Sequence, residues 1–478
     1  MVSGKLYQVM AATASSFGCI AMGLLNVWPS YTVPLLTSNT TNILSAPMTS
    51  SEESLLGSLP SLGAMVGTAV VGPLIETFGR KLGGVAVGLP FAVSWAIIAV
   101  AKSSILILVA RFLGGVAGGA YLILSPMFIS EVAEDSIRGA LSSSSILFYC
   151  FGALSSYLLG WFFSYHTIIW INMAVSVLCC ALLMGVPESP VYLMKKNREE
   201  DARVSMSLYR GVSPTSMIVQ EEISKIKRQI HPSVELTTII EKAEEAEKEK
   251  LNTEEIKEEP IQKTSALKTL YKSYASRRGF LVVITVITLQ VAMGMVPVQV
   301  YAKHVFNEAD PSQADLYSVF FAVVMVAGSL ITGGIADKAG RRILIIGSSA
   351  AVAVCMATLG MLIQTKVAPP WLTVVMILLY CFCFMCGAGS IPYVLLAEVF
   401  TPEVQACASM IIVEWVWFLN FLILVVFTWL NSLIGIHGTF YIFAVTSVIN
   451  TILSYILVPE TKGLSNNQIQ DLLRGRGK

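Results

Sequence analysis

Two stretches, GPLIETFGRK (residues 72–81) and GGIADKAGRR (residues 333–342), share one pattern and decide the fold. In each, an acidic residue is followed by a glycine and then by two basic residues. Each stretch also comes at the end of an apolar segment that is long enough to cross a bilayer. A charged pattern that recurs at matching places in two parts of an apolar chain indicates an internal duplication.

The composition predicts a membrane protein. Of the 478 residues, 55% are hydrophobic and only 13% are charged, and the mean hydropathy is +0.70. Soluble domains carry about 25% charged residues, so the deficit indicates a surface that faces lipid. A membrane-crossing helix needs about 20 apolar residues. The stretches that meet this length are 9–35, 55–75, 82–101, 105–129, 141–163, 167–186, 278–304, 314–335, 343–365, 371–397, 407–433 and 438–458.

These stretches are predicted to be helices although several are rich in valine and isoleucine, because every backbone group within a bilayer must be satisfied internally. The predicted fold is an all-α membrane protein with twelve transmembrane helices in two pseudo-symmetric six-helix bundles. The N-terminal bundle is expected over residues 1–186 and the C-terminal bundle over 277–458. A cytosolic linker with short helices (187–276) joins them, and a cytosolic tail (459–478) follows.

Lysine and arginine set the predicted orientation. With both termini in the cytosol, the outer loops contain only Lys102, Lys303 and Lys366, as the positive-inside rule requires. The loop after the first span carries Asn39-Thr40-Thr41, an N-glycosylation sequon that faces outward on this topology. We therefore predict a multi-pass protein of the plasma membrane that is glycosylated at Asn39.

Charged residues mark the cytosolic ends of the spans in both halves. We expect them to pair across the two bundles when the cytosolic side is shut, and so to act as a latch on the outward-facing state. The residues are Glu76, Arg80, Glu131 and Arg138 in the first half and Asp337, Arg341 and Glu398 in the second, with Pro187-Glu188 and Pro459-Glu460 closing the sixth and twelfth spans.

The two opening motifs resemble the paired signatures of the major facilitator superfamily, and further motifs resemble its sugar porter family. These are Arg111-x-x-x-Gly115, Pro126 with Glu131 and Arg138-Gly139, Pro187-Glu188-Ser189-Pro190, and Pro459-Glu460-Thr461-Lys462-Gly463. The run ESLLGS (53–58), leading to GPLIE (72–76), is especially similar to insect facilitated trehalose and glucose transporters. The resemblance covers nearly the whole chain and implies two bundles that rock about a central solute site.

The resemblance also implies a set of solute contacts at mid-membrane. The family positions that keep a polar or aromatic side chain here are Gln290, Tyr393, Trp417 and Asn420, and we predict that these bind the solute. At other family positions the polar residue is replaced, by Ile146, Val296 and Met325. A buried polar group left unpaired costs about 1–3 kcal/mol, so this site is predicted to be drier than a typical hexose site.

Two ionisable residues fall within predicted spans. Arg111 lies in the fourth span, but the first span lacks the aspartate that proton-coupled relatives place near this arginine, which favours passive transport. Glu414 lies about two turns into the eleventh span, where an ionisable group indicates a functional site. It could pair with a cationic solute, carry a proton, or form hydrogen bonds to neighbouring helices, and its place near the cytosolic end favours the last role.

Pro297 is predicted to loosen the seventh span so that its outer part moves as a gate.

The sequence thus predicts facilitative (uniport) transport of a sugar or sugar-like solute by alternating access, with a hexose or trehalose first and a less polar glycoside as a variant. A non-transporting sugar sensor on the same fold and a proton-coupled symporter remain alternatives. An enzyme is not expected, because the chain has no nucleophile–base pair and no phosphate-binding loop. The expected partners are the solute and the lipid bilayer, without a cofactor, metal, nucleic acid or obligate protein partner.

Overall fold

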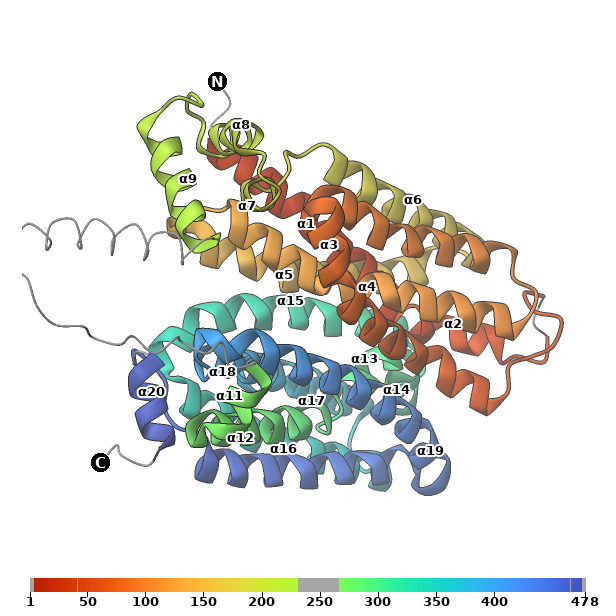
Figure 1. Cartoon of the computed structure of the whole chain (residues 1–478). Coiled ribbons are helices and arrows are strands. Elements are labelled where there is room, and N and C mark those ends of the chain that lie inside the picture. The colour runs from red at the N-terminus through yellow and green to blue at the C-terminus, as the bar shows by residue number, and fades with distance from the viewer. Residues whose placement is uncertain (1–3, 41, 231–265, 465, 475–478) are drawn as a thin grey trace, which may run out of the picture.

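The computed structural model describes residues 4–40, 42–230, 266–464 and 466–474. Within these ranges all regular structure is helical, which confirms the predicted all-α fold. The helices form two groups that lie side by side, α1–α9 and α11–α20 (Figure 1). We call these groups the N-terminal half and the C-terminal half.

The N-terminal half contains long helices followed by three short ones. They are α1 (Gly4–Val27), α2 (Pro29–Leu36), α3 (Ser50–Val100), α4 (Ser104–Val132), α5 (Asp135–Phe162), α6 (Tyr165–Met184), α7 (Pro190–Lys195), α8 (Glu199–Arg210) and α9 (Met217–Ile230).

The C-terminal half has the same plan but more interruptions. Its helices are α11 (Ala266–Lys272), α12 (Tyr274–Val291), α13 (Met295–Val300), α14 (Ala302–Ala309), α15 (Ala314–Ala339), α16 (Arg341–Thr365), α17 (Pro370–Cys383), the π-helix η1 (Phe384–Ala388), α18 (Ile391–Glu398), α19 (Pro402–Leu457) and α20 (Asn466–Leu473).

The described helices supply the twelve predicted crossings. Ten segments are long and apolar enough to cross a membrane, and two of them, α3 with 51 residues and α19 with 56, are far longer than one crossing needs. Each of the two bends at a glycine with positive φ, at Gly79 (φ 92°) in α3 and at Gly435 (φ 71°) in α19. A Cβ is disfavoured at positive φ, so glycine suits both bends. With α3 and α19 counted as two passes each, the prediction of twelve is confirmed.

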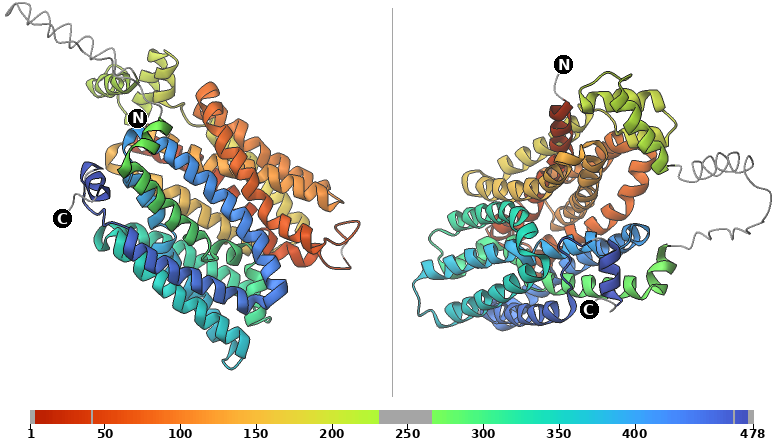
Figure 2. Two further views of the ribbon diagram at one scale, coloured as in Figure 1. Left: turned by 60° about the horizontal axis from the view of Figure 1, so that its bottom comes forward. Right: turned by 90° about the vertical axis from the view of Figure 1, so that its left-hand side faces the viewer.

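The two ends of the molecule differ in what they carry. The short helices α7, α8, α9 and α20 lie at one end, which we call the terminal face (Figure 1). The right-hand view of Figure 2 has this face toward the viewer, with the two halves side by side. Helices α2 and α14 lie toward the opposite end, which we call the distal face. Between the halves, α3 packs against α19 and α5 packs against α15.

The seventh crossing is broken into α12, α13 and α14, and the break differs from the prediction. The chain leaves the helix at Gly294 (φ 85°), where a Cβ would lie 2.2 Å from the Phe443 ring, so glycine is required there. Pro297 lies in the first turn of α13, where a missing N–H costs no helical hydrogen bond. The first interruption therefore lies at Gly294 and a second lies at Tyr301, between α13 and α14, while the gating role of Pro297 stays a prediction.

Candidate functional site

The predicted solute contacts lie on broken or long helices of the C-terminal half. Gln290 lies in the last turn of α12, and its Nε2 donates a hydrogen bond of 3.1 Å to the carbonyl oxygen of Gly389, in the turn before α18. Tyr393 comes from α18 and interacts with the Gln290 side chain. The side chain of Gln290 therefore ties together the two crossings whose helices are interrupted.

Three of the four predicted contacts carry buried polar atoms without a partner. Among the described residues, Gln290 Oε1, Trp417 Nε1 and Asn420 Oδ1 are buried and make no hydrogen bond. Trp417 and Asn420 are three residues apart on α19, so they share one face of that helix. Each such atom costs about 1–3 kcal/mol in the empty protein. A bound solute with hydroxyl groups would supply the missing partners.

A second polar cluster joins the two halves, and the sequence reasoning missed it. The Tyr149 hydroxyl of α5 accepts hydrogen bonds from Asn26 Nδ2 of α1 (3.2 Å) and from Gln299 Nε2 of α13 (3.1 Å). The Tyr157 hydroxyl donates to the backbone carbonyl of Gln299 at 2.6 Å. Asn26 and Gln299 could have been noticed as polar residues inside predicted spans, which are costly in a bilayer and therefore informative.

Further hydrogen bonds close the seam between the halves toward the distal face. The Ser54 and Thr428 hydroxyls bond to each other across α3 and α19. The Tyr301 hydroxyl donates to the carbonyl oxygen of Glu53 at 3.4 Å, and the Lys303 N–H donates to Ser30 Oγ at 3.0 Å. In this conformation the two halves are therefore held together at the distal face.

At the terminal face of the N-terminal half, one arginine is enclosed by acidic residues of its own half. The Arg80 guanidinium is fully buried and makes a two-pronged ion pair with Glu131, at 2.6 and 2.8 Å. The Glu188 carboxylate accepts hydrogen bonds from the backbone N–H groups of Arg80 (2.9 Å) and Lys81 (3.1 Å). It thereby caps the helix that begins after the Gly79 bend.

The C-terminal half repeats this arrangement. Arg341 pairs with Glu398 at 2.9 Å, and the Glu460 carboxylate accepts from the backbone N–H groups of Arg341 (3.0 Å) and Arg342 (3.2 Å). Gly340, with φ 91°, takes the place of Gly79. A Cβ on either glycine would lie within 3 Å of the capping carboxylate, which explains why both motifs place glycine before their basic pair.

In this conformation the ion pairs of these charges lie within each half, and the pairing that we expect across the bundles when the cytosolic side is shut stays a prediction. Arg80 pairs with Glu131, and Arg341 with Glu398, each inside one half. Arg138 donates to the carbonyl oxygen of Ala133, also in its own half. A carboxylate within its own half suits Arg80, which is fully buried in this conformation, because an uncompensated buried charge is costly.

Two further members of the predicted latch are Glu76 and Asp337. Glu76 is exposed on α3. The side chain of Asp337 lies outside the described residues.

Arg111 is buried on α4 and is held by backbone carbonyls. Its Nε donates to the carbonyl oxygen of Leu56 at 3.0 Å and its Nη1 to that of Leu25, and its guanidinium carbon lies 5.7 Å from the Trp28 ring centroid. Nη2 is buried and has no partner among the described residues. The first crossing thus contacts Arg111 through the carbonyl oxygen of Leu25 and the ring of Trp28.

Glu414 links the two halves. Its Oε1 accepts a hydrogen bond of 2.5 Å from the Thr68 hydroxyl, which joins α19 to α3. This contact is what the favoured structural role for Glu414 predicts, a hydrogen bond to a neighbouring helix. Glu414 and Thr68 lie on the helix pair that forms one of the main contacts between the halves.

Asn39 is exposed in the loop that follows α2, so its side chain is accessible for modification.

The helical fold and the repeated networks of Arg80 and Arg341 indicate the class of membrane transporters that the sequence predicts. Comparison with known proteins confirms this class. Residues 14–473 match the family described as "Sugar (and other) transporter". The chain therefore belongs to this family of membrane transporters, and the predicted resemblance to the sugar porters is confirmed.

Individual transporters are similar to this chain over nearly its whole length. The chain is 27% identical to the facilitated trehalose transporter Tret1 of Polypedilum vanderplanki, over 98% of this chain and 88% of that protein. It is 26% identical to Tret1 of Aedes aegypti over 98% of this chain, but it spans only 55% of that longer protein. Its fold is similar to that of the xylose transporter XylE from E. coli in a partially occluded inward open conformation, with a TM-score of 0.75, 21% identity, and coverage of 96% of this chain and 99% of that one.

Proposed function

We propose that this protein is a facilitative carrier that moves a sugar or sugar-like solute across a membrane by alternating access, with trehalose or a hexose as the first candidates. The buried, unpartnered atoms of Gln290, Trp417 and Asn420 carry the proposal. They belong to residues that the resemblance implies for solute binding, and a polyhydroxylated molecule would satisfy them. The names of the insect relatives support the choice of trehalose.

The carrier would work by exchanging one set of contacts between the halves for another. The Tyr149–Gln299 and Tyr301–Glu53 bonds keep the distal face shut in the conformation described here. They must break for the solute to enter or leave on that side. The Arg80 and Arg341 networks each stay within one half, so we propose that they keep each bundle rigid while the bundles move against each other.

Transport without ion coupling is the second part of the proposal. A proton-coupled cycle needs an ionisable group that changes its charge near the moving seam. Glu414 lies at that seam, and the variant Glu414→Gln tests whether it has this role. Arg111 is held by the carbonyls of Leu25 and Leu56 and by Trp28 rather than by an acid of the first crossing. We further propose that the terminal face is cytosolic, that the membrane is the plasma membrane, and that Asn39 is glycosylated on the distal side.

Counterflow in proteoliposomes tests this proposal directly. Vesicles loaded with unlabelled trehalose should take up labelled trehalose transiently above its equilibrium level, with no imposed proton gradient. The same vesicles should be assayed with glucose and with an aromatic glycoside to rank the solutes. Binding without exchange would instead identify a sensor, and uptake that requires a proton gradient would identify a symporter.

Tyr149→Phe is expected to weaken the distal closure. The change removes the hydroxyl that joins Asn26 to Gln299, and each net hydrogen bond contributes about 0.5–1.5 kcal/mol. We expect a cysteine placed at Ser54 to react about 2- to 10-fold faster with an aqueous maleimide in this variant. Tyr165→Phe is the matched control and should leave the rate unchanged, because the buried Tyr165 hydroxyl has no hydrogen-bond partner in the part of the chain that the structure describes.

Glu414→Gln should leave the pH profile of uptake unchanged. Glutamine keeps an oxygen that accepts the hydrogen bond from Thr68, so the contact between α3 and α19 survives. The measurement is initial uptake of labelled trehalose between pH 5.5 and 8 in matched vesicles. If the wild-type protein showed a pH dependence that the variant lost, Glu414 would carry a proton and the passive mechanism would be wrong.

A further inference from the structure

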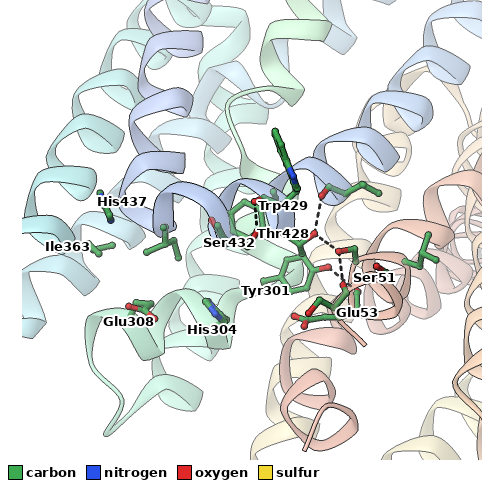
Figure 3. A pocket seen from close by; sticks show the side chains of 18 of the residues that line it. Ser51, Glu53, Tyr301, His304, Glu308, Ile363, Thr428, Trp429, Ser432 and His437 are labelled. Carbon is green, nitrogen blue, oxygen red and sulfur yellow. Dashed lines mark hydrogen bonds between the residues drawn. The ribbon is translucent and has the colours of Figure 1, made fainter. Parts of the chain in front are cut away.

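A pocket of about 1020 Å³ lies toward the distal face (Figure 3), and its lining includes none of the four predicted solute contacts. Small-molecule pockets usually measure about 300–1,000 Å³, so this one has room for a disaccharide. One wall comes from the start of α3, where Ser51, Glu53 and Ser54 lie. The other walls come from α14, from the end of α16 and from the bend of α19. The pocket therefore lies on the seam between the two halves.

The lining is suited to a neutral molecule that both donates and accepts hydrogen bonds. Hydroxyl groups come from both halves, at Ser51 and Ser432 among others, and Gln364 adds an amide. Charges of both signs are present, with the Glu308 carboxylate and the Lys366 ammonium in the same lining. This mixture gives little selection for an ion of either sign, whereas every polar group can pair with a hydroxyl.

Aromatic rings complete the site. Tyr301 and Trp429 are among the residues that line the pocket, and Figure 3 labels both. Tyr301 is stacked on Phe427 with a centroid distance of 5.7 Å and an interplanar angle of 14°, which holds its ring in place. The pocket thus offers flat apolar surfaces next to hydrogen-bonding groups.

We propose that this distal pocket is a second binding site, for polyhydroxylated solutes such as sugars and glycosides, separate from the central site. The inference extends the proposed function, because it gives the carrier a place to hold solute at its distal mouth. A solute there contacts α3 of one half and α14 and α19 of the other. The site is shared between the halves and is available when the distal face is closed.

Protection of an introduced cysteine tests the site separately from transport. Ser51 is exposed and lines the pocket, so Ser51→Cys should react with an aqueous maleimide. The background should also carry Gln290→Ala and Asn420→Ala, which disable the central site. At a trehalose concentration three times its dissociation constant, the labelling rate should fall about fourfold. Tetramethylammonium chloride at the same concentration should give no protection.

Two further substitutions test whether the protection comes from binding in this pocket. Ser432→Trp fills the pocket from α19 and should abolish it. Asn307→Ala changes an exposed residue of α14 that does not line the pocket and should leave it intact. Protection that disappears in the Gln290→Ala/Asn420→Ala background, or that survives Ser432→Trp, would overturn the proposal. Protection by tetramethylammonium but not by trehalose would overturn the solute class. Counterflow that fails while protection persists would reject the transport function and keep the site.

Discussion

Glu131→Gln should produce a large loss of stability. It leaves the guanidinium of Arg80, whose side chain is fully buried, without its charged partner. Breaking a buried ion pair in this way costs about 3–5 kcal/mol. We expect the melting temperature of the detergent-solubilised protein to fall by about 5–10 °C and trehalose uptake to fall in parallel with the amount of folded protein.

The double variant Arg80→Met/Glu131→Leu tests whether the loss of stability comes from the unpaired buried charge. Apolar residues of similar size leave no uncompensated charge, so this variant should recover most of the melting temperature. Asp201→Asn is the matched control, because Asp201 pairs with Arg198 at 2.7 Å while both side chains are more than half exposed. Exposed pairs contribute about 0–1 kcal/mol. An Asp201→Asn loss as large as that of Glu131→Gln would contradict the role given to burial.

Asn420→Leu should have the second large effect, and it should move stability and transport in opposite directions. Asn420 Oδ1 is buried and unpartnered, so removing the amide relieves a cost of about 1–3 kcal/mol in the empty protein. The same change removes a partner for the solute. We expect a higher melting temperature together with trehalose uptake that is lower by about tenfold or more at subsaturating concentrations.

Two companion variants make this result specific. Gln290→Ala should also lower uptake by about tenfold, but without a gain in stability, because its Nε2 already bonds to Gly389. Asn172→Leu is the control: Asn172 lies on α6, which packs against α1 and α3 of its own half, and both of its amide atoms are buried without partners. It should become more stable with unchanged uptake. Normal uptake by both Asn420→Leu and Gln290→Ala would show that the site assignment is wrong.

Much of the fold could be predicted from the sequence, because a bilayer allows few solutions. Length and low polarity were enough to place all twelve crossings, including the two that run on into the next through Gly79 and Gly435. The duplication was visible because each half has the same capping arrangement. In each, a glycine is followed by an arginine whose backbone N–H donates to a carboxylate. The position of the break at Gly294 was missed, since a proline nearby gives a stronger local signal than a glycine.

The site could be predicted less completely, because pairing between distant residues depends on how the halves meet. The composition of the spans does not show that Arg80 meets Glu131 within one bundle. It also does not show that Tyr149, Asn26 and Gln299 converge from three helices. The residues that the resemblance selected remain predictions, but three of them carry the unpaired buried atoms that a binding site requires.

The central claim is that two rigid halves move in opposite senses about a shared solute site. Distances between spin labels on exposed residues, measured by pulsed electron paramagnetic resonance, would test this claim on both faces at once. One pair at Ser51 and Ser432 would report the distal face, and a second pair at Thr77 and Glu403 the terminal face. The account predicts that, as conditions shift the population, the distal distance lengthens whenever the terminal distance shortens. Distances that stay fixed on both faces, or that lengthen together, would contradict it.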